Sequence, residues 1–186
     1  QEDNMMRTTR HEMLKEIKTR FANRALKDQP VPMETLEALV EAAGNAPSCF
    51  NEQPWRFLVA QGERKEKLLA TLTPQNQEWA GRAAALVLTL SKKTFTQGGK
   101  DNYWHMSDAG CAAGFFMLEA ERRGLTAHPM AGFSRGAARE AFDIPEDFDI
   151  VHVMAVGWPG DLELLSEKNQ ARNRPRTRKP IEELML

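Results

Sequence analysis

Apolar side chains recur along this chain with the periods of helices and strands in turn. The spacing of Met33, Leu36, Leu39, Val40 and Ala43 is that of an amphipathic helix over about 33–44. Further helices are expected over about 9–20, 63–72, 102–123 and 135–142. Mostly apolar runs of strand length lie near 55–61, 83–90, 125–130 and 149–157. Because helices and strands alternate, the pattern predicts an α/β or α+β sandwich with a sheet of at least four strands.

Two segments depart from these simple patterns. The expected helix over about 102–123 is lined with small residues, namely Ala109, Gly110, Ala112, Ala113 and Gly114. Glycine costs about 1 kcal/mol relative to alanine inside a helix, so this composition indicates close approach of another backbone, in the core or at a subunit interface. Beyond Pro159 and Gly160 the chain is polar and shows little apolar periodicity. We expect this tail to be disordered or to lie along another surface.

A loop rich in residues that restrict the backbone separates the helix over about 33–44 from the first strand. Its sequence is Ala46-Pro47-Ser48-Cys49-Phe50-Asn51-Glu52-Gln53-Pro54-Trp55. Proline fixes a backbone angle, while serine and asparagine offer polar groups close to the main chain. Taken alone, this segment is either an ordinary helix-to-strand connection or a loop that contacts a ligand.

Bulk properties narrow the class of protein. A length of 186 residues fits one domain, residues 1–186, with a core that needs neither disulfides nor metals. The 25 Lys and Arg nearly balance the 26 Asp and Glu, so global attraction to nucleic acid or to an anionic membrane is not expected. No apolar run reaches the length of a membrane span, and Gln1 to Asn4 lack the features of a signal peptide. Together with only two cysteines, this composition favours a reducing, cytoplasmic setting.

Standard catalytic motifs are missing. The sequence contains no Gly-x-Gly-x-x-Gly, no Walker-type phosphate loop and no Gly-x-Ser-x-Gly elbow. The four histidines are scattered, so we expect no metal site. Cys49 has no candidate base near it in the sequence. We therefore assign no catalytic side chain.

The remaining candidate chemistry suits a phosphate and a flat ring. Arg20 and Arg24 lie four residues apart and can chelate a phosphate from one helical face or across a helix end. Arg176 and Arg178 form a second basic pair. The segment Pro129-Met130-Ala131-Gly132 would allow main-chain N–H groups to approach an aromatic heterocycle closely.

These motifs, in this order, resemble those of the flavin-dependent nitroreductase family, over roughly Ile17 to Glu183. The loop Ala46-Pro47-Ser48-x-x-Asn51-x-Gln53-Pro54-Trp55 is the most specific match. The other matches are short and gain force from their order, namely Arg20-x-Ala22-x-Arg24, Pro129-Met130-Ala131-Gly132-Phe133 and Arg176-x-Arg178-x-Pro180.

The resemblance implies an α+β three-layer sandwich, with a central mixed, mostly antiparallel sheet flanked by helices, in an intertwined homodimer. Each interface cleft would hold one FMN, and residues 161–186 would form an arm that reaches the partner subunit. Arg20, Arg24, Arg176 and Arg178 would neutralise the FMN phosphate, with Ala22 between the first pair. Pro47, Ser48, Cys49 and Asn51 of the other subunit would line the isoalloxazine ring. Asn76 and the segment Pro129, Met130, Ala131 and Gly132 would contact the flavin, with the N–H groups of Ala131 and Gly132 near its N5.

The implied reaction is a ping-pong, two-electron reduction of a nitroaromatic or quinone-like small molecule by NADH or NADPH. Because the flavin carries the chemistry, the absence of a catalytic constellation is expected. Two alternatives keep the FMN: reduction of a specialised acceptor such as an enone or halogenated ring, and a flavin-binding protein without catalysis. The chain departs from the family pattern at Ala22, Cys49 and Ala131, where serine, serine and glutamate are frequent. The segment between Leu90 and Asp108 is short, which predicts an open cleft whose acceptor the sequence does not specify.

Overall fold

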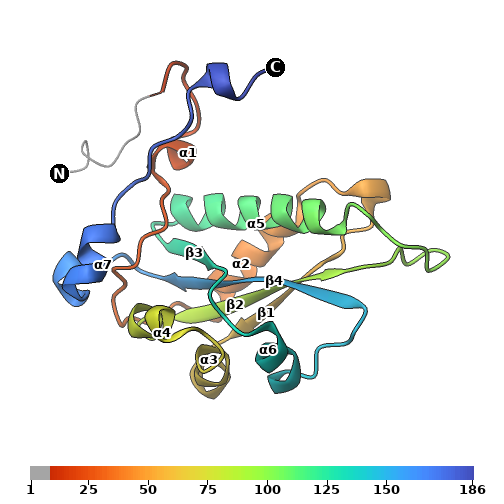
Figure 1. The fold of residues 1–186 in the computed structure, drawn as a ribbon, viewed down its shortest axis with the longest axis horizontal. Coiled ribbons are helices and arrows are strands. Elements are labelled where there is room, and N and C mark those ends of the chain that lie inside the picture. Colours follow the sequence, from red (N-terminus) through yellow and green to blue (C-terminus); the bar gives the residue numbers. More distant parts are fainter. Residues whose placement is uncertain (1–8) are drawn as a thin grey trace.

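The fold is built on one four-stranded sheet. The computed structural model describes residues 9–186; the expectation about Gln1 to Asn4 falls outside them. The strands are β1 (Trp55–Ala60), β2 (Ala85–Lys92), β3 (Thr126–Met130) and β4 (Phe148–Gly157). Their order across the sheet is β1-β2-β4-β3 (Figure 1). All three pairings are antiparallel, which agrees with the mostly antiparallel sheet that the resemblance implied, although none of the described pairings is parallel.

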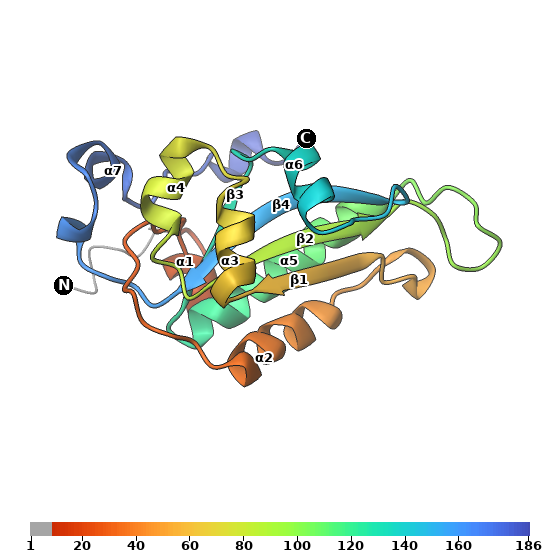
Figure 2. The same ribbon diagram turned by 90° about the horizontal axis from the view of Figure 1, so that it is seen from below.

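Helices cover both faces of the sheet and complete the expected three layers. One face carries α2 (Met33–Gly44) and α5 (His105–Arg122). The other carries α3 (Gly62–Leu69), α4 (Pro74–Ala80) and α6 (Arg135–Ala141) (Figure 2). Strand β2 contributes to two hydrophobic cores, with Leu86 and Leu88 in one and Val87 in the other. Burial on both faces explains why this strand is a continuous apolar run in the sequence.

Several helix boundaries follow directly from local sequence features. Helix α2 occupies the predicted range 33–44. The Ser134 hydroxyl caps α6 by accepting a hydrogen bond from the Ala137 N–H at 3.1 Å. Gly124 follows α5 with a φ of 75°, the left-handed conformation that glycine adopts most readily after a helix.

The predicted helix over about 9–20 is wrong in its length. Only α1, Lys15–Thr19, is helical. The apolar side chains of this segment, Met13, Leu14 and Ile17, are exposed, Leu14 at 64%. A short helix gains most of its stability from packing of an apolar face, and that face has no cover here.

A second difference concerns the predicted helix over about 63–72. Helix α3 already ends at Leu69, and Pro74 begins a separate helix, α4. Proline suits this first helical position because its missing N–H would lack an intrahelical partner there. This short helix was missed by the sequence analysis, and it carries Asn76.

The polar tail is more ordered than its composition suggested. It contains short 3₁₀ turns at Leu162–Leu164 and Ile181–Glu183, and the helix α7 (Glu167–Arg172). Leu165 and Asn169 are buried, so the first part of the tail packs on its own chain. Farther along, the tail runs beside the N-terminal segment (Figure 1), where Arg10 forms an ion pair with Glu182.

Candidate functional site

Two arginine-bearing segments from opposite ends of the chain meet beside the sheet. Arg20 and Arg24 lie on the extended segment after α1, with the half-buried Ala22 between them. The pKa of Arg20 is lowered, first by burial and then by the positive charge of Arg178, while Glu121 acts in the opposite direction. A charge can have this effect only at short range, so the structure brings a member of each predicted pair together.

Arg24 is likewise surrounded by positive charges. Its pKa is lowered by burial first, and then by the charges of Arg176 and Arg172. Its guanidinium lies over the ring of Trp79, with 5.9 Å from Cζ to the ring centroid. A partly buried group of positive charges such as this one attracts an anion, and arginine matches phosphate oxygens with paired N–H donors.

His128 of β3 lies behind this group of charges without adding to it. Its ring stacks on Trp79 with centroids 4.5 Å apart, and its Nδ1 is 3.1 Å from the Asn23 carbonyl oxygen. Burial, together with the weaker effect of the charges of Arg24 and Arg20, lowers the pKa of His128 to about 4, while the bond to the Asn23 carbonyl acts in the opposite direction. The imidazole is therefore neutral at pH 7, and the stacked rings of Trp79 and His128 form an uncharged surface beneath Arg24.

The predicted flavin residues Asn76 and Gly132 are in direct contact. The Asn76 Nδ2 donates a hydrogen bond to the Gly132 carbonyl at 3.0 Å, and the Thr73 N–H donates to the same oxygen at 2.9 Å. A Cβ on residue 132 would lie 2.7 Å from Asn76 Nδ2 and 3.1 Å from Thr73 Oγ1. Glycine is thus required for this close approach.

Helix α4 connects the two parts of the site. Asn76 and Trp79 lie three residues apart on it, which places them on neighbouring turns of one face. Asn76 contacts Gly132, whereas Trp79 lies beneath Arg24. The candidate phosphate end and the candidate ring end therefore share one short rigid element. Trp79 was missed by the sequence analysis, although its spacing from Asn76 was an available signal.

The remaining residues of the predicted ring segment differ in what they can offer. The Met130 side chain is buried in the core next to the sheet, so only its main chain can face a ligand. Pro129 is half-buried, and Ala131 is exposed just after β3. The Ala131 carbonyl accepts a hydrogen bond from the Phe133 N–H at 3.1 Å, which tightens the turn around Gly132.

The loop between α2 and β1 has a strained backbone. Phe50, Asn51 and Gln53 all have positive φ, near 50°, a region that residues other than glycine seldom occupy. The Ser48 Oγ accepts a hydrogen bond from the Gln53 N–H at 2.9 Å, and the Asp108 carboxylate accepts one from the Cys49 N–H at 3.0 Å. Side-chain and main-chain bonds thus hold an unfavourable conformation, as is common in loops that contact ligands.

This loop does not meet the arginines of its own chain. It leads into Trp55, which pairs with Ser91 near the end of β2, whereas Leu26 after the arginine segment bridges Pro159 at the opposite end of the sheet. At about 3.3 Å per residue, the two ends of β2 lie about 23 Å apart. In both views α4 and α7 lie at one end of the sheet and the loop at the other (Figure 1 and Figure 2).

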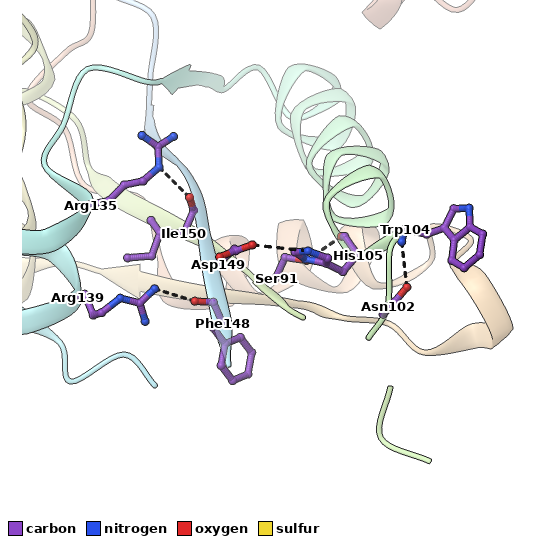
Figure 3. A network of polar contacts seen from close by, with 9 residues as sticks. All are labelled: Ser91, Asn102, Trp104, His105, Arg135, Arg139, Phe148, Asp149 and Ile150. Carbon is purple, nitrogen blue, oxygen red and sulfur yellow. Dashed lines mark hydrogen bonds and ion pairs between the residues drawn. The ribbon is translucent and has the colours of Figure 1, made fainter. Parts of the chain in front are cut away.

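The start of α5 carries a polar network that the sequence did not reveal (Figure 3). The His105 Nδ1 is 3.0 Å from Ser91 Oγ, and its Nε2 is 3.6 Å from a carboxylate oxygen of Asp149. These are the residue types of a hydrolase triad, but Ser91 is fully buried and its hydroxyl donates to the His105 carbonyl at 2.7 Å. The network instead fixes the start of α5 against β2 and β4.

Residues 9–186 lack two further features. No group of three His, Cys, Asp or Glu side chains is arranged to hold a metal ion. Nor is any helix in this range long and apolar enough to cross a membrane.

Comparison with known proteins agrees with this geometry. The model of the family described as "Nitroreductase family" matches residues 17–78 and 70–158. A protein of Archaeoglobus fulgidus, provisionally named NADH dehydrogenase/NAD(P)H nitroreductase, is 30% identical over 156 residues, which cover 81% of this chain and 87% of the relative. The iodotyrosine deiodinase of Nematostella vectensis is 24% identical over 207 residues, which cover 94% of this chain and 74% of the relative.

Among solved structures, one described as an oxidoreductase containing FMN superposes with a TM-score of 0.93. It is 30% identical, and the match covers 97% of this chain and 93% of that one. The family model spans well over half of the chain, and these relatives span most of it. The chain belongs to the nitroreductase family.

Proposed function

We propose that this protein is an FMN-dependent NAD(P)H oxidoreductase that reduces nitroaromatic or quinone-like acceptors by two electrons in a ping-pong reaction. The observation that carries the proposal is the joining of two predicted sites through α4. Trp79 of this helix supports Arg24, and Asn76 of the same helix contacts Gly132. A ligand with a phosphate at one end and a flat polar ring at the other fits this arrangement.

The residues present fit FMN at both ends. The phosphate would be held by Arg20, Arg24, Arg176 and Arg178. The two segments are close enough for this, since positive charges of the second segment contribute to lowering the pKa values of Arg20 and Arg24. The ring would lie at the Asn76–Gly132 contact, where a Cβ on residue 132 would collide with the amide. This glycine allows a ligand and the main chain to approach closely.

When bound, FMN would supply the redox chemistry. This is the transfer of two electrons to the acceptor from NADH or NADPH, which gives them as a hydride. The chain's own part is binding and electrostatics. The arginines neutralise the phosphate, and main-chain N–H groups near Ala131 and Gly132 would stabilise negative charge on the ring. No side-chain acid or base is assigned to the reaction.

A homodimer completes the proposed site. Pro47, Ser48, Cys49 and Asn51 lie at the far end of the sheet from the arginines of their own chain, so in our proposal they line the ring bound by a second copy. Helix α5 supports this assembly, because a Cβ at Gly110 or Gly114 would meet no atom of residues 9–186 within 4 Å, apart from the neighbouring backbone of α5 itself. Close packing within this chain therefore does not explain these glycines. Residues 161–186 would form the arm that reaches the partner.

One alternative acceptor has support from a specific observation. The relative in Nematostella vectensis is named for deiodination of an aromatic amino acid. A halogenated ring is thus the second acceptor class to test beside nitroaromatics and quinones. Reduction of an enone and binding of flavin without catalysis would be distinguished in the same assays.

The first experiment is FMN titration of the purified, flavin-free protein, with the variant Arg20→Ala/Arg178→Ala and the control Arg64→Ala on α3. Loss of two charge-assisted contacts, each about 1.5–3 kcal/mol, should weaken FMN binding at least about 100-fold. Arg64→Ala should bind as the wild type does. Unchanged affinity in the double variant would reject the phosphate site.

The second experiment measures turnover. Stopped-flow reduction of the FMN-loaded protein by NADH and by NADPH identifies the donor, and a panel of nitroaromatic, quinone, enone and halogenated acceptors identifies the class of substrate. If neither nucleotide reduces the bound flavin, the oxidoreductase proposal is rejected, and the remaining function is flavin binding without catalysis.

A further inference from the structure

The arginine site raises a structural problem of its own. Arg20 and Arg24 lie on one segment, Arg176 and Arg178 on another, and like charges on the two segments repel each other. Arg172 adds a fifth positive charge near Arg24. Before an anion binds, other contacts must hold the two segments together.

A pair of asparagines makes these contacts. The Asn173 Oδ1 accepts a hydrogen bond from the Arg24 main-chain N–H at 2.7 Å. The Asn173 Nδ2 donates to Asn23 Oδ1 at 2.8 Å, and this oxygen also accepts from the Ala25 N–H at 2.9 Å. One side chain of the C-terminal arm thus contacts two successive residues of the N-terminal segment.

Asn23 is anchored in the body of the protein. Its side chain is only 6% exposed, and its carbonyl oxygen lies 3.1 Å from the ring of His128 on β3. Two residues farther along, the Ala25 carbonyl accepts a hydrogen bond from the Gly160 N–H at 2.8 Å. The asparagine pair therefore ties the C-terminal arm to a segment that is itself anchored at the edge of the sheet.

We propose that Asn23 and Asn173 are positioning residues, an amide clasp that holds the two arginine pairs in one arrangement complementary to a phosphate monoester. This inference rests on the proposed function and adds to it two residues that make no contact with the ligand themselves. The clasp binds the main-chain N–H of Arg24 itself, so its loss would let the second pair of arginines move away from the first. Binding of the phosphate would then have to order the arm.

The test compares FMN with riboflavin, which has the same ring but no phosphate. The dissociation constants of both are measured by fluorescence titration of flavin-free wild type, Asn173→Ala, Asn23→Ala and the double variant. Gln170→Ala is the matched control, because Gln170 also donates from a side-chain amide in the arm, but to Leu165 of the same arm. Thermal unfolding without ligand reports on folding.

We expect the wild type to prefer FMN over riboflavin, and each single variant to reduce this preference at least tenfold through weaker FMN binding. The double variant should lose little more than either single variant, because the two asparagines act as one unit. Gln170→Ala should keep the wild-type preference. A structural defect alone would weaken both ligands equally and leave their ratio unchanged.

The outcomes separate the two proposals. A wild type that prefers FMN, with an unchanged preference in folded Asn173→Ala or Asn23→Ala, would overturn the clasp and leave the proposed function standing. A wild type that binds no FMN, or binds both flavins equally, would overturn the phosphate site and the clasp together.

Discussion

The Asn76 side-chain amide donates to the carbonyl of Gly132 at 3.0 Å, and residue 132 has no Cβ to obstruct it. The two residues lie on different elements, α4 and the turn after β3. Their contact fixes the relative position of a polar side chain and a half-buried piece of main chain. In the proposed site both face the flavin ring.

Substitution Gly132→Ala should separate this local effect from global stability. The new methyl would lie 2.7 Å from Asn76 Nδ2, and a side-chain amide can move away at a cost of about 1 kcal/mol. Loss of one ring contact should weaken FMN binding about tenfold. Gly136→Ala is the control, since a Cβ there meets no atom within 4 Å. Wild-type FMN affinity in Gly132→Ala would show that the Asn76 amide does not contact the ring.

Acid should destabilise the flavin-free protein through two buried histidines. Burial lowers the pKa of both His128 and His152 to about 4, below the value of about 6.5 expected in the unfolded chain. The unfolded state therefore takes up protons first as the pH falls. This contribution to stability is complete above pH 6.5 and decreases between pH 6.5 and pH 4, by up to about 3 kcal/mol per histidine.

Urea unfolding at pH 7, 5.5 and 4.5 measures this slope. His152→Gln should flatten part of it, whereas His11→Gln, at an exposed position, should not. An equal slope in wild type and His152→Gln would mean that His152 does not contribute to acid sensitivity.

The strained loop is tied to the hairpin that follows β2. The Glu52 carboxylate accepts hydrogen bonds from the Thr96 N–H at 2.8 Å and from its hydroxyl at 2.6 Å. Glu52→Ala should increase the amide exchange rate of Thr96 about fivefold, because a bond worth about 1 kcal/mol is lost. Glu52→Gln keeps an acceptor oxygen and should have a smaller effect. Equal exchange rates in wild type and Glu52→Ala would show that the hairpin is held by other contacts, such as Phe95 against Phe50.

Sequence patterns predicted the elements whose apolar faces pack within one chain. The four strands and α2 are confirmed, since residues such as Leu86, Val87 and Leu39 are buried as their spacing requires. The helix over about 9–20 failed because Leu14 has no apolar surface to pack on. Periodicity identifies an apolar face and says nothing of whether the chain covers it.

The site was predicted only as separate motifs. The arginine pairs and the segment with Gly132 could be named because their residue types and spacing have a chemical meaning, whereas Asn76 was named only through the resemblance to the family. Asn173 could not, because its contact with Arg24 spans 149 residues and carries no local pattern. The separation between the loop and the arginines could not be predicted either, because it depends on the register of the sheet.

The central claim is that each flavin site takes its arginines from one copy and its loop from another, and one mixed dimer tests it. Arg20→Ala/Arg178→Ala and Ser48→Ala/Asn51→Ala are co-expressed with different affinity tags, and the dimer that carries both tags is purified. FMN is then titrated at a concentration that fills both sites of the wild type and neither site of the homodimeric variants.

If the sites are shared between copies, the mixed dimer has one intact site, formed by the arginines of the loop variant and the loop of the arginine variant. We predict one FMN per mixed dimer, bound with wild-type affinity. If each site were built from a single copy, every site would carry a defect, and a mixed dimer that binds no FMN would contradict the account.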